Sequence, residues 1–295
     1  MGKYETIVQA SLQIFKTYNT ALTLRQLFYR LVSKRILDNT LSNYKLLSKF
    51  LVKARETGEV DGAYLEDRTR TTANADWGYD SIEEFIEACE RRVQGMASGF
   101  SMTFWEGQHY RVEVWVEKDA LSKLCSTAAG EYNVTTCPSR GYSSYTYVKD
   151  AADRISSYPV DCETVILYFG DYDPSGLDIE RDLTARLHRY GAHNVQVKRV
   201  ALSLVQIQEY KLPPFPAKTK DPRYARFLAD TGGSEAVELD ALEPPVLEAL
   251  IKENIEAFIN MDKWNSRMRE NLDKRDEVKV KFKNARLAFN GEEED

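Results

Sequence analysis

The fold is decided by residues 164–176, which read TVILYFGDYDPSG. The run Thr164–Phe169 is apolar almost throughout, which predicts a central strand buried on both faces of a parallel sheet. The segment Gly170–Gly176 then supplies a tight turn, and Asp173-Pro174 suits the start of a helix at about 177–190. The stretch therefore predicts a strand, a turn that carries two aspartates, and a helix.

Strands and helices alternate on both sides of this stretch. Residues 111–117 alternate strictly between valines and larger or charged side chains, as in a strand. The pattern as a whole predicts a doubly wound α/β domain, which binds ligands beyond the carboxyl ends of its strands. The other expected elements are helices at 120–129 and 145–156 and strands at 132–136 and 195–200.

Three carboxylates follow two of the expected strands. Asp171 and Asp173 are two residues apart, so in an extended segment they point the same way. Glu117 closes the strand at 111–117 and converges on them if the strands are neighbours. Three such oxygen ligands predict a Mg²⁺ site that could also take Mn²⁺. The alternative is purely structural, with Asp171 capping a loop and Asp173 capping the helix. A haloacid-dehalogenase-type phosphatase is disfavoured, because its motif follows the first α/β strand.

Charge is divided unevenly along the chain. The net charge is −6, but residues 1–60 carry +6 and the remainder −12. Helices are expected at 3–18, from Thr23, and at 40–57, where Lys45, Lys49 and Lys53 form one basic stripe. With a β-wing at 60–72, these helices predict a winged helix-turn-helix that binds DNA. The alternative is a small helical bundle with a solvated lysine face.

One tyrosine stands beside an arginine on the second expected helix. Arg25 and Tyr29 are four residues apart and share a face, away from the apolar stripe. A guanidinium there could hold a phosphate against the tyrosine hydroxyl and favour the phenolate. A phenol with a pKa of about 10 needs that help to attack at neutral pH. With 17 tyrosines in the chain, a structural role is the default alternative.

Composition limits the remaining possibilities. The four cysteines show no CxxC spacing, so neither a zinc site nor a disulfide framework is expected. No apolar run is long enough for a membrane helix and no signal peptide is recognisable, which predicts a cytoplasmic protein. We expect a winged-helix domain at 1–75, a linker with one helix at 76–108, an α/β domain with a C-terminal extension at 109–261, and a charged helix with an acidic tail at 262–295.

Three motifs, in this order, resemble those of the A subunit of topoisomerase VI and the related meiotic double-strand-break proteins, most closely the stand-alone Mini-A-like proteins. Residues 25–29 (RQLFY) match the motif of the catalytic tyrosine, 116–120 (VEKDA) that of the Toprim glutamate, and 171–176 (DYDPSG) that of the Toprim aspartates. Gly141-Tyr142 matches a further segment, but Ser143-Ser144 replace its Pro-Asp. Residues 238–242 (ELDAL) resemble the C-terminal part of the family.

The resemblance implies a winged helix followed by a Toprim domain. It also implies that Tyr29, assisted by Arg25, forms a 5′-phosphotyrosyl link, with Mg²⁺ on Glu117, Asp171 and Asp173. Double-stranded DNA, a second copy of the chain and a separate GHKL-type ATPase subunit are the expected partners, in the nucleoid. No ATP-binding motif occurs in this chain. The expected DNA contacts are Lys45, Lys49, Lys53, Arg55, Lys118, Arg140, Gly141 and Tyr142.

Two other functions remain open from the sequence. A hydrolytic Toprim nuclease would use the three carboxylates without a tyrosine. A DNA-binding regulator would keep the Toprim domain only as a scaffold.

Overall fold

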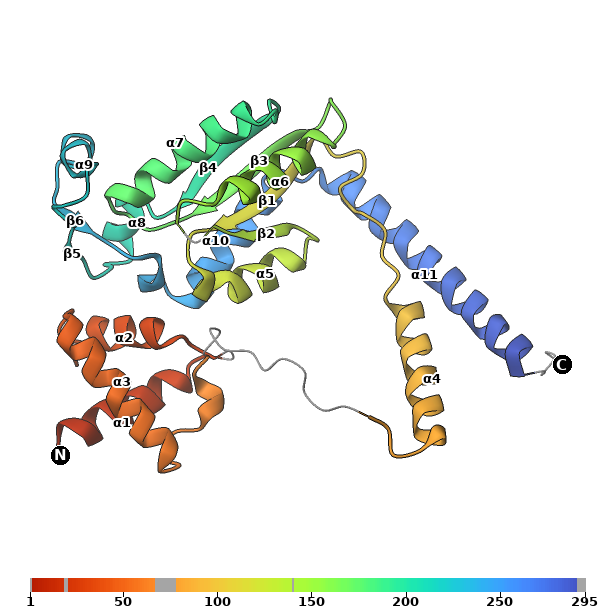
Figure 1. The fold of residues 1–295 in the computed structure, drawn as a ribbon, viewed down its shortest axis with the longest axis horizontal. Helices are drawn as coiled ribbons and strands as arrows, with labels where there is room; N and C mark the ends of the chain where they lie inside the picture. The colour runs from red at the N-terminus through yellow and green to blue at the C-terminus, as the bar shows by residue number, and fades with distance from the viewer. Residues whose placement is uncertain (1, 19–20, 67–77, 140, 291–295) are drawn as a thin grey trace. The chain divides into compact units, whose positions relative to one another are not determined.

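The computed structural model describes residues 2–18, 21–66, 78–139 and 141–290 (Figure 1). The chain divides into two compact units. The first comprises residues 1–70 and 110–258, and the second comprises residues 71–109 and 259–295. The first unit holds every residue that the sequence singles out for chemistry and that the structure describes.

Three helices open the first unit: α1 (Lys3–Phe15), α2 (Leu24–Ser33) and α3 (Leu41–Glu56). Thr23 and Gln26 form a reciprocal capping box at the start of α2, and Thr40 caps α3. After α3 the chain turns at Gly58, whose φ of +76° lies in the left-handed region. The three predicted helices are confirmed, although α1 ends at Phe15 rather than at residue 18.

The segment after α3 was expected to form a β-wing at 60–72. Its described part contains a short 3-10 turn, η1 (Gly62–Tyr64), and an isolated parallel bridge between Leu22 and Leu65. Residues 67–72 lie outside the described residues. The wing therefore stays a prediction.

Four strands form the predicted parallel sheet. They are β1 (Tyr110–Val116), β2 (Thr135–Pro138), β3 (Glu163–Phe169) and β4 (Val195–Ala201), in the spatial order β2-β1-β3-β4. Helices α6 (Tyr145–Ser156) and α7 (Pro174–Arg189) cover one face, and α5 (Ser122–Gly130) and α10 (Pro244–Glu256) cover the other (Figure 1). The chain is therefore a mixed α/β protein with a buried parallel sheet, as the apolar run at 164–169 predicts.

Three elements of the predicted α/β domain start more than one residue from the expected position. The strand expected at 132–136 begins only at Thr135, because the chain is still turning at Asn133, whose φ is +51°. The helix expected from residue 177 begins at Pro174, since Asp173 caps it one turn earlier. The helix expected at 120–129 opens as a 3-10 turn, η2 (Asp119–Leu121), before α5.

The chain then leaves the sheet through short elements before α10. These are α8 (Leu204–Glu209), β5 (Phe215–Pro216), α9 (Tyr224–Thr231), β6 (Glu235–Ala236) and η3 (Leu239–Ala241). Tyr172, which follows β3, exchanges two backbone hydrogen bonds with Val237 (2.8 and 2.9 Å). This pairing places the residues after Val237 beside the turn that carries Asp171.

The second unit contains α4 (Ile82–Ser98) and α11 (Met261–Asn290), which pack against each other. Trp264 of α11 contacts Phe104 and Trp105, with ring centroids 5.2 and 5.6 Å apart, respectively. The linker helix and the terminal helix of the sequence interpretation are thus parts of one unit. No helix within the described residues is long and apolar enough to cross a membrane.

Candidate functional site

The candidate site lies where the connections of the sheet reverse direction. The chain passes from β1 outward to β2 and from β3 outward to β4, so the reversal falls between the neighbouring strands β1 and β3. Glu117 follows β1 and Asp171 follows β3 by two residues. The Asp171 amide donates to Oε2 of Glu117 at 3.0 Å. The structure therefore brings these two predicted ligands together at the edge where parallel sheets bind ligands.

Two glycines allow the turn after β3 to fold this tightly. A Cβ atom on Gly170 would lie 2.7 Å from Oε2 of Glu117, and one on Gly176 would lie 2.2 Å from the carbonyl oxygen of Asp171. Both separations are shorter than real contacts allow. The glycines in GDYDPSG are therefore needed for close approach, and any larger residue would move a predicted ligand.

Asp173 has the role that the structural alternative predicted, as the N-cap of α7. Its Oδ1 accepts hydrogen bonds from the Gly176 amide (2.6 Å) and the Ser175 hydroxyl (2.9 Å). Its charge still acts on Glu117: burial raises the pKa of Glu117 above its ordinary value, and the charge of Asp173 adds to that rise. Within the described residues, no three His, Cys, Asp or Glu side chains form a group ready to hold a metal ion.

The donor chemistry nevertheless fits a hard divalent cation. Glu117, Asp171 and Asp173 supply only carboxylate oxygens, which Mg²⁺ prefers. Burial raises the pKa of Asp171 to about 7; Lys118 opposes this rise, and Glu117 adds to it. Negative charge is therefore crowded at this edge, and a bound cation would offset it.

Lys118 provides the positive charge at this edge in the present structure. Its Nζ lies 3.2 Å from Oδ1 of Asp171, 2.8 Å from Oε2 of Glu238 and 2.7 Å from Oδ2 of Asp240. Burial alone would lower the pKa of Lys118, but these three carboxylates raise it above its ordinary value. The sequence assigned Lys118 to DNA contact, whereas the structure encloses it among acids.

Tyr29 and Arg25 lie in the same charged neighbourhood. Arg25 donates to Oε2 of Glu238, and Arg30, on the same helix, donates to the carbonyl of Ala241. Tyr29 is only 4% exposed, so it is not on an open face of α2. Burial raises its pKa above 10, and Glu238 adds to the rise while Lys118 and Arg25 oppose it. In this arrangement the phenol is protonated.

Apart from Lys118, the expected DNA contacts fall into two groups. Lys45, Lys49, Lys53 and Arg55 are exposed on α3, and the ammonium of Lys53 also lies 4.6 Å from the ring centroid of Tyr4. The three exposed lysines match the predicted basic stripe, and Arg55 is exposed on the same helix.

The second group follows β2. Gly141 has a φ of +79°. Tyr142 donates to Oδ2 of Asp178 (2.7 Å) and stacks under Arg223, 5.0 Å from the guanidinium carbon to the ring centroid. Burial and the hydrogen bond to Asp178 raise the pKa of Tyr142 to about 12. Arg140 lies outside the described residues.

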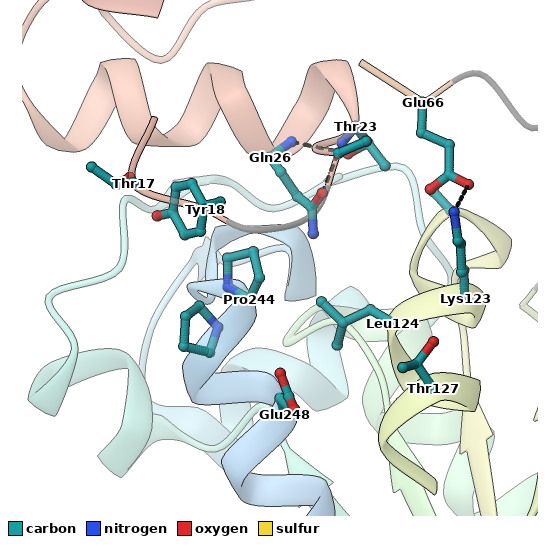
Figure 2. Close-up of a pocket in the computed structure, with 13 residues that line it drawn as sticks. Thr17, Tyr18, Thr23, Gln26, Glu66, Lys123, Leu124, Thr127, Pro244 and Glu248 are labelled. Atoms are coloured by element: carbon teal, nitrogen blue, oxygen red, sulfur yellow. Dashed lines mark hydrogen bonds and ion pairs between the residues drawn. The ribbon is translucent and has the colours of Figure 1, made fainter. Parts of the chain in front are cut away.

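Described residues around α2 line a larger and a smaller cavity. The larger, about 600 Å³, lies between α2, α5 and α10, and Figure 2 shows Gln26, Lys123 and Pro244 among its walls. It contains none of the predicted site residues. The smaller, about 390 Å³, is lined by Arg25, Lys118 and Asp240 among others. Charged side chains converge on the smaller cavity, but neither Tyr29 nor the three candidate metal ligands line it.

Three residues of this neighbourhood were not predicted as site residues. Glu238 and Asp240 both accept hydrogen bonds from Nζ of Lys118, and Leu239 between them donates its amide to Oδ1 of Asp171 (2.8 Å). Their alternation with apolar neighbours is visible in the sequence, but their partner Lys118, 120 and 122 positions away, is not. Arg199 of β4 also reaches the turn after β3 and carried no sequence signal.

Comparison with protein-family models, with curated proteins and with solved structures finds no match to this chain.

Proposed function

We propose that this chain cleaves double-stranded DNA by transesterification, with Tyr29 as the nucleophile, as in A subunits of the topoisomerase VI type. In this proposal α1–α3 are the winged-helix module and the sheet is a Toprim domain. One observation carries it: Glu238 pairs with Arg25 beside Tyr29 and with Lys118, while the adjacent amide of Leu239 donates to Asp171. Two consecutive residues, Glu238 and Leu239, therefore contact both the helix that carries Tyr29 and the candidate metal ligand Asp171.

The proposed step exchanges one phosphate ester for another. Oη of Tyr29 forms a bond to phosphorus, and the bond from phosphorus to the 3′ oxygen of the DNA breaks. The phenol loses its proton, and the leaving 3′ oxygen takes up a proton to become a hydroxyl. The guanidinium of Arg25 binds the same phosphate. Mg²⁺, held by Glu117, Asp171 and Asp173, would supply positive charge that offsets the negative charge of the phosphate.

The present arrangement is a resting state in this proposal. Tyr29 is buried, and its pKa is raised by burial and by Glu238. α2 must therefore part from Glu238 before the phenol reaches DNA, and a phosphate then replaces the carboxylate as the partner of Arg25. In a homodimer, Tyr29 of one copy would serve the carboxylates of the other, and both strands would be cut with a short stagger.

A second candidate is hydrolysis of DNA by a metal-dependent Toprim nuclease with no covalent intermediate. The observation that favours it is the same burial of Tyr29, since a hydrolase needs only Glu117, Asp171 and Asp173. The two candidates share the metal site and differ in the nucleophile.

The deciding experiment incubates the protein with supercoiled DNA and Mg²⁺, stops the reaction with detergent, and tests for protein attached to 5′ ends. The wild type should give attached protein, Tyr29→Phe should give neither cleavage nor attachment, and the control Tyr64→Phe should match the wild type. Tyr64 stacks on Phe15 at 5.1 Å and keeps that ring contact as phenylalanine. Cleavage that persists in Tyr29→Phe, without attachment, would establish the hydrolase instead.

A further inference from the structure

Arg199 of β4 extends its side chain toward the turn that follows β3. Nη1 donates to the carbonyls of Gly170 (3.2 Å) and Asp171 (3.3 Å), and Nη2 donates to the carbonyl of Gly176. Nη1 also lies within 3.4 Å of the carbonyls of Ala201 and Leu202. One guanidinium thus spans the beginning and the end of the turn that carries Asp171 and Asp173.

The same side chain is connected to all three candidate metal ligands. It holds Asp171 directly, through that residue's own carbonyl. It holds Asp173 through Gly176, whose amide donates to Oδ1 of Asp173 at 2.6 Å. It reaches Glu117 through Tyr168: the guanidinium carbon lies 5.2 Å from the centroid of that ring, and the Tyr168 hydroxyl donates to Oε2 of Glu117 at 3.3 Å.

The partners of Arg199 are unusual for a largely enclosed cation. Its side chain is only 12% exposed, yet its contact with a carboxylate, Glu180, is 3.6 Å long and outside hydrogen-bonding distance. Its short contacts are to backbone carbonyls. Buried cations normally pair with carboxylates. Here Nε makes that ion pair with Glu180, while the fork of Nη1 and Nη2 fixes backbone geometry. Arginine suits this use because its donors lie in one rigid plane.

We propose that Arg199 is a positioning residue for the divalent cation, and that it sets the spacing of Glu117, Asp171 and Asp173 through the turn and Tyr168. This inference rests on the proposed function, because it requires the cation to bind at these carboxylates. Residues that hold metal ligands in place without touching the metal commonly lower metal affinity about 10- to 100-fold when they are mutated.

The test measures Mn²⁺ binding to the full chain without DNA, from the loss of the free-ion signal in electron paramagnetic resonance. Arg199→Met should bind Mn²⁺ about 10-fold more weakly than the wild type. Arg199→Lys keeps the charge but cannot span Gly170 and Gly176, so it should also bind several-fold more weakly. Arg189→Met, at an exposed arginine on α7, is the control and should bind as the wild type does. Thermal melting gives the folded fraction, so that affinity is expressed per folded molecule.

Tyr168→Phe tests the connection to Glu117 alone, since it removes one hydroxyl and keeps the ring; it should also weaken Mn²⁺ binding. If the wild type binds Mn²⁺ and Arg199→Lys binds it equally well, the positioning role is overturned while the metal site stands. If the wild type does not bind Mn²⁺, the metal site and the role of Arg199 both fall. Should Arg199→Met not fold, Arg199→Lys and Tyr168→Phe decide the question.

Discussion

Arg25 and Lys118 donate to the same carboxylate oxygen, Oε2 of Glu238, from α2 and from the end of β1, respectively. Burial would raise the pKa of Glu238, but these two cations keep it below its ordinary value. The carboxylate is therefore ionised and connects the helix that carries Tyr29 to the edge of the sheet. The same contact holds α2, which carries the buried Tyr29, at the edge of the sheet.

Removing the charge of Glu238 should loosen α2. Glu238→Gln keeps the shape but weakens the hydrogen bonds to Arg25 and Lys118, which should lower the free energy of local opening by about 1 kcal/mol. Backbone amides of residues 27–33 should then exchange with deuterium about fivefold faster, as mass spectrometry of peptides would show.

The matched control is Glu253→Gln, at an exposed position on α10. It should leave exchange in α2 unchanged. Equal protection of α2 in the wild type and in Glu238→Gln would mean that Glu238 does not hold the helix, and that Tyr29 is covered by apolar packing alone.

The sequence predicted the elements whose signals are local. Thr23 and Thr40 cap their helices as expected, and the apolar run before Gly170 is a buried central strand. The meeting of Glu117 with Asp171 was also predictable, because it follows from strand adjacency alone. The burial of Tyr29 was not predictable from the sequence. Its helix contacts Glu238 and Ala241, which lie more than 200 positions later in the chain. Such a partner leaves no trace in the periodicity of α2.

A buried ion pair in the sheet should matter for stability. Glu113 of β1 is fully buried and receives two hydrogen bonds of 2.9 Å from Arg154 of α6, together with one of 3.0 Å from Trp115. Arg154→Met would leave this carboxylate without a cation. We expect a loss of about 2 kcal/mol in the free energy of unfolding, less than for a fully buried pair because the Arg154 side chain is 35% exposed.

Urea denaturation measures this loss, and the double variant Glu113→Gln/Arg154→Met separates charge from packing. Neutral glutamine needs no cation, so the double variant should be more stable than Arg154→Met alone. If the two were equally unstable, the loss would come from the packing of the arginine stem rather than from its charge.

The basic stripe of α3 should account for part of the salt dependence of DNA binding. Replacing Lys45, Lys49 and Lys53 by alanine should weaken binding to duplexes of any sequence. It should also reduce the slope of log affinity against log salt by about one for each phosphate that a lysine had neutralised. The same three positions changed to arginine keep the charge and should preserve the slope. An unchanged slope in the alanine variant, measured by fluorescence anisotropy, would place the DNA elsewhere.

The four cysteines should differ sharply in reactivity. Burial raises the pKa of Cys137 to about 12, and the neighbouring Glu113 adds to that rise. At pH 8 about one Cys137 in ten thousand is then the reactive thiolate. Burial also raises the pKa of Cys162, and Cys125 is fully buried. Cys89 of α4 is only half-buried. An Ellman titration of the native protein at pH 8 should therefore show one fast thiol, and four in urea.

The fast thiol should disappear in Cys89→Ser and remain in Cys137→Ser. Because the pKa of Cys137 is raised, the thiolate fraction of this residue stays small until the pH approaches about 12, so raising the pH from 8 to 9 should leave only one fast thiol. The buried thiols should react at a rate set by opening of the sheet domain, which makes that rate sensitive to Arg154→Met. A second fast thiol in the native protein that disappears in Cys137→Ser would show that the face of the sheet under α6 is open to solvent.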